Sequence, residues 1–162
     1  MSQENPERAR QSWHDDLIYG FHLRCADPER DIWRSELVLD IDHILEWVAE
    51  ADGRVKFRVA PATLVFHEVS DLRIEIDFVA AGLRHNLNEL AIASIDRRPV
   101  ESEAGIAKRD HERWRIELNL PRGGAISFTS SGYDLTLRAP SQLLGEQRLP
   151  ADERPPLYTH QF

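Results

Sequence analysis

The chain has 162 residues, of which 41% are hydrophobic and 30% charged, and its formal net charge is −8 at pH 7. This length predicts one domain that buries a core without needing a disulfide or a structural metal. The acidic balance argues against binding to nucleic-acid phosphates or to an anionic membrane surface, and the single cysteine, Cys25, excludes an intrachain disulfide.

The sequence predicts neither a membrane span nor a signal peptide. No apolar run approaches the roughly 18 residues that a membrane-spanning helix needs. Residues 1–10 are polar and lack the apolar stretch of a signal peptide. Because a single cysteine also suits a reducing compartment, we expect a cytoplasmic protein.

The N-terminal part of the chain predicts short strands separated by turns. Residues 1–12 carry little that packs, and we expect them to be flexible. Alternating polar and apolar residues predict a strand over about 16–25 and a second strand over about 33–41. Residues 43–50 fit either a short helix or a continuation of the second strand, and both interpretations stay open.

The clearest strand pattern follows in residues 61–79. A third strand is predicted over 54–60, and Pro61 is expected to break or bend it. A β-branched and aromatic run then leads to a turn at Ser70-Asp71, and residues 72–78 carry an apolar side chain at every second position. We therefore expect two strands joined by that turn, the second with one buried face and one solvated face.

The C-terminal part of the chain predicts further strands. A weaker pattern indicates a strand over 89–97, and clear alternation returns in 114–120. The residues Pro-Arg-Gly-Gly at 121–124 predict a hairpin turn into a strand over 125–130, and a second turn leads into 133–138. These last three strands predict an antiparallel meander.

Taken together, these elements indicate the fold class. Eight or nine short strands with one or two short helices predict a mainly β fold, in which an antiparallel meander forms a curved sheet, a sandwich or a partly open barrel. The alternation does not separate these three architectures. We expect residues 13–140 to form a single β-rich domain, residues 1–12 a flexible N-terminal segment and residues 141–162 an extended C-terminal tail.

One group of side chains resembles a functional site. The seven histidines form none of the spacings typical of zinc sites. The nearest to a cluster is His-Asp-Asp at 14–16, His22 and the run Asp-Ile-Asp-His at 40–43. If the first two strands pair, His22 and Asp40 or Asp42 can lie on one face, and His22, Asp40, Asp42 and His43 are the candidate metal ligands or acid and base. The alternative is a hydrated strand face, because alternating strands must present polar side chains to solvent. No cofactor motif is present, so we assign no cofactor-binding or metal-binding residues.

Three stretches carry a resemblance to known proteins: His-Asp-Asp at 14–16, LVLDIDHILEW and PATLVFHEVSDLRIEIDF. Within residues 14–79 they resemble a family of small uncharacterised bacterial β-rich proteins that is distantly similar to toxin-immunity proteins. The resemblance includes no catalytic motif and carries over no site residues. It implies a cytosolic bacterial protein with a protein-binding role.

These observations predict a non-enzymatic protein-binding protein. Its acidic charge suits a basic protein partner such as a nuclease-type toxin, and exposed edge strands would permit a homo-oligomer. Two alternatives remain open. One is a small metal-dependent or acid/base enzyme using His22, Asp40, Asp42 and His43, and the other is a β protein that holds a small apolar ligand.

Overall fold

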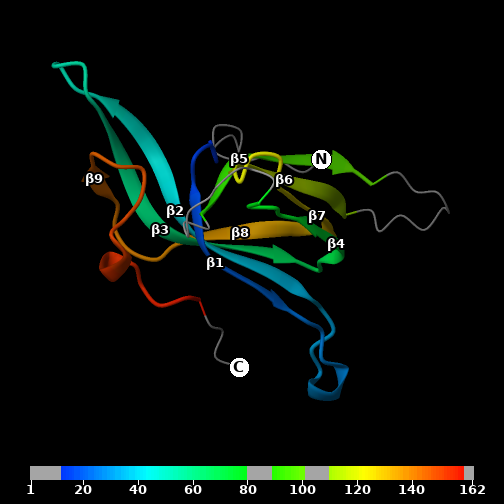
Figure 1. Ribbon diagram of the computed structural model, residues 1–162. Helices are drawn as coiled ribbons and strands as arrows, with labels where there is room; N and C mark the ends of the chain where they lie inside the picture. Colours follow the sequence, from blue (N-terminus) through cyan, green and yellow to red (C-terminus); the bar gives the residue numbers. More distant parts are fainter. Residues whose placement is uncertain (1–11, 80–88, 101–109, 159–162) are drawn as a thin grey trace.

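The computed structural model describes residues 12–79, 89–100 and 110–158 (Figure 1). It confirms a mainly β antiparallel fold: the described residues form nine strands in one sheet and two three-residue 3-10 turns, η2 and η3. The strands are β1 (Leu17–Arg24), β2 (Glu36–Ala49), β3 (Val55–His67), β4 (Ser70–Glu75), β5 (Leu90–Pro99), β6 (Glu112–Leu120), β7 (Ala125–Ser130), β8 (Gly132–Leu137) and β9 (Gln142–Leu144). The turns are η2 (Pro28–Arg30) and η3 (Ala151–Glu153). No helix among them is long and apolar enough to cross a membrane.

The sheet bends round on itself. Its strands lie in the order β4-β7-β6-β5-β1-β2-β3-β8, with β9 paired to the outer edge of β3. β3 leads directly into β4 and β7 directly into β8, and the pairing continues from one half to the other, with Thr63 opposite Thr136 and Ile74 opposite Ile126. At the corner, Glu68 adopts a positive φ of 52° and the carbonyl of His67 accepts a hydrogen bond from Ser131 N. β4, at one end of the strand order, therefore continues β3, and β8, at the other end, continues β7.

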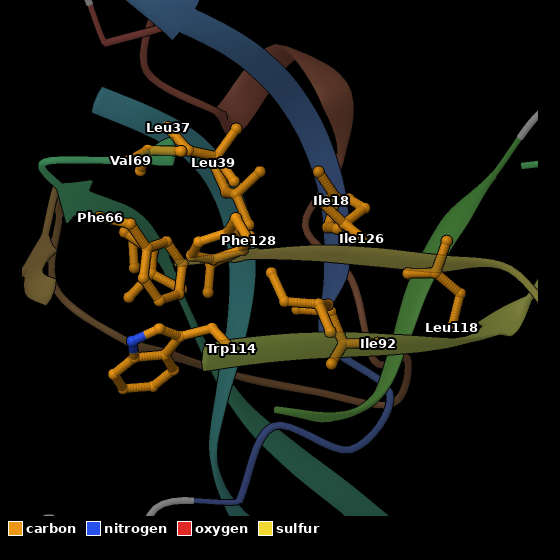
Figure 2. Close-up of a cluster of buried hydrophobic side chains, with 14 residues drawn as sticks. Ile18, Leu37, Leu39, Phe66, Val69, Ile92, Trp114, Leu118, Ile126 and Phe128 are labelled. Carbon is orange, nitrogen blue, oxygen red and sulfur yellow. The ribbon is translucent and has the colours of Figure 1, made fainter. Parts of the chain in front are cut away.

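The space inside this curve is filled by side chains (Figure 2). Phe66 lies edge-on to Trp114 and to Phe128, with ring centroids 5.3 and 4.7 Å apart. Such aromatic pairs add to the free energy gained by burying their area. The cluster, called the interior core below, comprises Ile18, Leu37, Leu39, Ile41, Ala62, Leu64, Phe66, Val69, Ile92, Trp114, Ile116, Leu118, Ile126 and Phe128. These side chains occupy the position that an enclosed apolar ligand would need.

β2 and β3 extend beyond this core as a hairpin, called the arm below, over residues 43–60. Figure 1 shows the arm projecting from the rest of the sheet, with β9 beside it. The arm carries a second, smaller cluster in which Ile44, Val59 and Leu149 are buried against Phe57 and Leu144. Two of these five side chains come from the C-terminal part of the chain, so that part covers one face of the arm.

The structure settles one open prediction and corrects three others. The turn predicted at Ser70-Asp71 is wrong, because both residues belong to β4 and the chain bends at Glu68 instead. Residues 43–49 continue β2 as a strand rather than forming a helix. Pro61 does not interrupt β3, because it lies between the stretch of β3 that pairs with β9 and the stretch that pairs with β8, where the missing N–H is not needed. The predicted meander is wrong in its last step. β8 pairs with β3 and not with β7, because Ser131 lies at the corner of a bent strand rather than in a hairpin.

The chain after β9 lies against the sheet. We call residues 145–158 the strap. Apart from η3 the strap has no helix or strand and bends at 145–148 and at Arg154. It crosses β1 and β2 on the face opposite the interior core, as its contacts below show. The rest of the predicted tail, 159–162, lies outside the described residues, as do residues 1–11 of the predicted N-terminal segment.

Candidate functional site

Two aspartates on β2 lie beneath the strap. Leu39 and Ile41 point into the interior core, so the alternation of the strand puts Asp40 and Asp42 on the opposite face. Both carboxylates are 0% exposed. A buried charge is tolerated only when it is paired and hydrogen-bonded, so their partners define the site.

Asp42 binds an arginine of the strap through two nitrogens. Arg154 Nη2 donates to Asp42 Oδ2 at 2.7 Å, and Arg154 Nε donates to Oδ1 at 3.2 Å. The backbone N–H of Leu149 donates to Oδ2 at 3.1 Å. Two parallel N–H donors on one carboxylate give the strongest and most directional kind of ion pair in proteins. Asp42 is therefore saturated by a guanidinium group and a main-chain donor from the same segment.

Asp40 holds the end of the strap through the backbone. Tyr158 N donates to Asp40 Oδ2 at 2.9 Å, and the Thr63 hydroxyl donates to Oδ1 at 2.5 Å. Arg138 Nη1 donates to Thr63 Oγ1 at 3.0 Å and lies 3.4 Å from Asp40 Oδ1. Arg138 Nη2 also donates to the carbonyl of Pro156 at 3.1 Å. Arg138 thus joins the carboxylate to the strap.

β1 contributes Tyr19 and Gly20 to the contact between the sheet and the strap. The guanidinium group of Arg154 lies over the Tyr19 ring, 4.8 Å from its centroid. Burial, followed by the charges of Asp40 and Asp42, raises the pKa of Tyr19 to about 12, so its hydroxyl stays protonated. Next to Tyr19, Gly20 leaves room for the strap, because a Cβ there would collide with the Leu157 side chain.

A groove of about 710 Å³ opens between β1 and the strap. Its walls include Tyr19 from the sheet and Arg148 and Arg154 from the strap. Arg148 forms an exposed ion pair with Glu89 across it. The strap is therefore fixed along its inner side and open to solvent along the groove.

Asp16 and His43 form a separate buried pair. Asp16 Oδ2 lies 2.6 Å from His43 Nδ1, and Asp16 Oδ1 accepts a hydrogen bond from Ile44 N at 2.8 Å. The ring of Trp13 lies 5.2 Å from that of His43. Burial, opposed by the contact with His43, raises the pKa of Asp16 to about 6. Asp16 accepts the hydrogen bond of Ile44 N at the point where β1 no longer pairs with β2. Asp16 therefore has a structural role.

The structure brings together only part of the predicted site. Asp40 and Asp42 share one face, whereas His43 points to the opposite face toward Asp16. His22 lies on β1 opposite Val38, partly exposed. Among the described residues no group of three or more His, Cys, Asp or Glu side chains is placed to hold a metal ion.

The partners of the two aspartates were not predicted from the sequence. Arg154 and Tyr158 stand 112 and 118 residues further along the chain, in a stretch predicted as an extended tail. The only available signal was an arginine followed by two prolines and two large apolar residues, which is an unusual composition for a tail without contacts.

The arrangement binds a guanidinium group and an extended backbone, and it presents no unsatisfied carboxylate oxygen for acid or base chemistry at Asp42. Donors to both carboxylates come from one peptide segment. Comparison with family models, with curated proteins and with solved structures finds no match to this chain.

Proposed function

We propose that the protein is a non-catalytic binding protein, and that it recognises an arginine-bearing extended segment of a basic protein partner at Asp40 and Asp42. A single observation carries the proposal. Asp42 binds the guanidinium group of Arg154 through two nitrogens, and Asp40 accepts a hydrogen bond from the backbone N–H of Tyr158, four residues further along the same segment. This is the chemistry of peptide recognition, in which side-chain pockets and main-chain hydrogen bonds act together.

The electrostatics favour the same class of partner. Buried, bidentate arginine contacts are typical of the residues that dominate the energy of protein interfaces. The net charge of −8 accelerates association with a basic protein. A basic nuclease-type toxin is one partner of this chemistry, which agrees with the resemblance to immunity proteins described above.

In the free protein the strap occupies this site. A tethered segment competes with an effective concentration on the order of millimolar. A partner segment therefore needs to displace the strap, and the groove beside Tyr19 gives it a place to begin. Leu157 is 50% exposed, so the outer side of the strap is accessible while its inner side remains bound.

The test uses the full-length chain with Arg154→Ala, which leaves the Asp42 charge buried without its main partner. We expect the free energy of unfolding to fall by about 3–5 kcal/mol. A labelled synthetic peptide of residues 148–158 should then bind the variant, detected by fluorescence anisotropy, and raise its Tm. The same peptide with alanine in place of Arg154, and with Arg148 kept, should bind at least about tenfold more weakly.

The matched control is Arg148→Ala, which removes only the exposed ion pair with Glu89. This control should keep its strap in place and bind the peptide no better than the wild type does. If Arg154→Ala does not fold, Arg154→Lys keeps the charge without the two-pronged contact and serves instead. A folded variant that fails to bind the peptide would contradict the proposal.

A further inference from the structure

A second site lies on the far side of the sheet, on the outer face of β4, β7, β6 and β5. Trp114 and Ile116 of β6 point into the interior core, so Arg113 and Arg115 point outward. β5 places Arg98 directly opposite Arg113, and β7 places Thr129 on the other side of Arg113. Two arginines therefore face each other across neighbouring strands of the sheet.

Two arginines in this relation repel each other. Residues directly opposite on antiparallel strands have Cβ atoms about 4.5–5.5 Å apart, and like charges there destabilise the sheet. Other arginines on this face are neutralised along their own strands: Arg73 pairs with Glu75 at 2.8 Å and Arg115 with Glu117 at 3.1 Å. Within the described part of the chain, neither Arg98 nor Arg113 has an ion pair or a side-chain hydrogen bond.

The surface is hollowed where these arginines lie. A depression of about 490 Å³ is lined by Arg98, Arg113, Ser127 and Thr129, so guanidinium and hydroxyl donors surround it. Asp71, Asp96 and Glu117 also line it and limit where an anion can sit. Asp96 accepts a hydrogen bond from Ser94 at 2.8 Å, Asp71 accepts one from the Thr129 hydroxyl at 3.4 Å, and Glu117 pairs with Arg115. The position favourable to an anion is therefore over the Arg98–Arg113 pair.

We infer that this depression binds a phosphate group, either as inorganic phosphate or as a phosphate monoester, between Arg98 and Arg113. Planar guanidinium groups match the oxygens of a tetrahedral dianion with paired hydrogen bonds. The bound dianion replaces the repulsion of the two arginines with attraction. This inference concerns a different face from the strap and does not depend on the proposed function.

The test compares the wild type with Arg98→Gln and Arg113→Gln at constant ionic strength. In chloride buffer each variant should melt at or above the wild-type Tm, because the repulsion is removed. Inorganic phosphate should raise the Tm of the wild type and bind each variant at least about tenfold more weakly. O-phosphoserine is the second probe: tighter binding than inorganic phosphate would indicate a phosphate carried on a larger molecule, and equal binding would indicate free phosphate.

The control is Arg58→Gln, on the arm, where the arginine pairs with Glu46. Its response to phosphate should equal that of the wild type. If phosphate stabilises Arg98→Gln and Arg113→Gln as much as the wild type, or fails to stabilise the wild type, the inference is overturned.

Discussion

Three aspartates of this protein are completely buried, and each is stabilised by a different set of donors. Asp42 has a guanidinium group, Asp40 has a hydroxyl and a backbone N–H, and Asp16 has a histidine and a backbone N–H. Only Asp16 lacks an arginine partner. Burial consequently dominates at Asp16, and its pKa rises from 3.8 to about 6.

This raised pKa predicts a pH dependence of stability. Between pH 4 and pH 6 the folded protein keeps a proton on Asp16 that the unfolded chain has released, so the free energy of unfolding falls as the pH rises. The contribution is on the order of 3 kcal/mol and is fully lost above pH 6. In Asp16→Asn the same hydrogen-bond acceptor is present without the charge. Urea unfolding at pH 4, 5, 6 and 7 should show the variant gaining stability relative to the wild type as the pH rises.

The exposed Asp52→Asn is the control for that series, because its carboxylate lies at the surface of the arm. Its stability relative to the wild type should stay nearly constant over the same pH range. The prediction is wrong if the difference in the free energy of unfolding between the wild type and Asp16→Asn does not change with pH. Asp16 would then be ionised at all these pH values in the folded protein.

At the scale of elements, the contact between β1 and the strap depends on the missing side chain of Gly20. A Cβ there would collide with Leu157 and lie 3.1 Å from both the Cβ and Oδ2 of Asp40. The end of the Leu157 side chain is half exposed and can move, whereas Asp40 is held by Thr63 and Tyr158. The strap, rather than the sheet, is therefore expected to yield.

Gly20→Ala should accordingly destabilise the protein by about 1 kcal/mol, at the low end of the range for overpacking. In a Leu157→Ala background the same substitution should cost clearly less, because the colliding atoms are absent. A double-mutant cycle measured by urea unfolding tests this coupling. Gly145→Ala is the control, since a Cβ at that position meets nothing within 4 Å. Equal costs in the two backgrounds would assign the strain to Asp40 instead.

At the scale of the whole molecule, the strands could be predicted and their arrangement could not. Alternation in 72–78 and 114–120 is a local property, and it correctly indicated strands there, β4 ending at Glu75. The corner at Glu68 and the pairing of β8 with β3 depend on contacts far apart in the sequence. Alternation also placed Asp40 and Asp42 on one face, but grouping His43 with them ignored that neighbouring residues on a strand point to opposite sides.

The molecule also has two separate hydrophobic clusters, which predict two levels of stability. The interior core links β1, β2, β3, β5, β6 and β7, whereas the smaller cluster links only the arm, β9 and the strap. Elements with few buried apolar contacts open locally at a lower free energy than the rest of a protein. The strap and the outer part of the arm should therefore open without unfolding of the interior core.

Ile116→Ala and Leu149→Ala separate these levels, because both side chains are nearly completely buried, one in each cluster. Ile116→Ala should lower the free energy of global unfolding by about 2–5 kcal/mol and accelerate hydrogen exchange at all of the slowest amides. Leu149→Ala should accelerate exchange at the amides that the strap donates, Leu149 N to Asp42 and Tyr158 N to Asp40. The amide of Ile92, which donates to Asp16 O next to the interior core, should keep its wild-type rate in that variant. Equal acceleration at Tyr158 and Ile92 would instead show that the strap opens only when the whole sheet unfolds, and a partner could then reach Asp40 and Asp42 only through global unfolding.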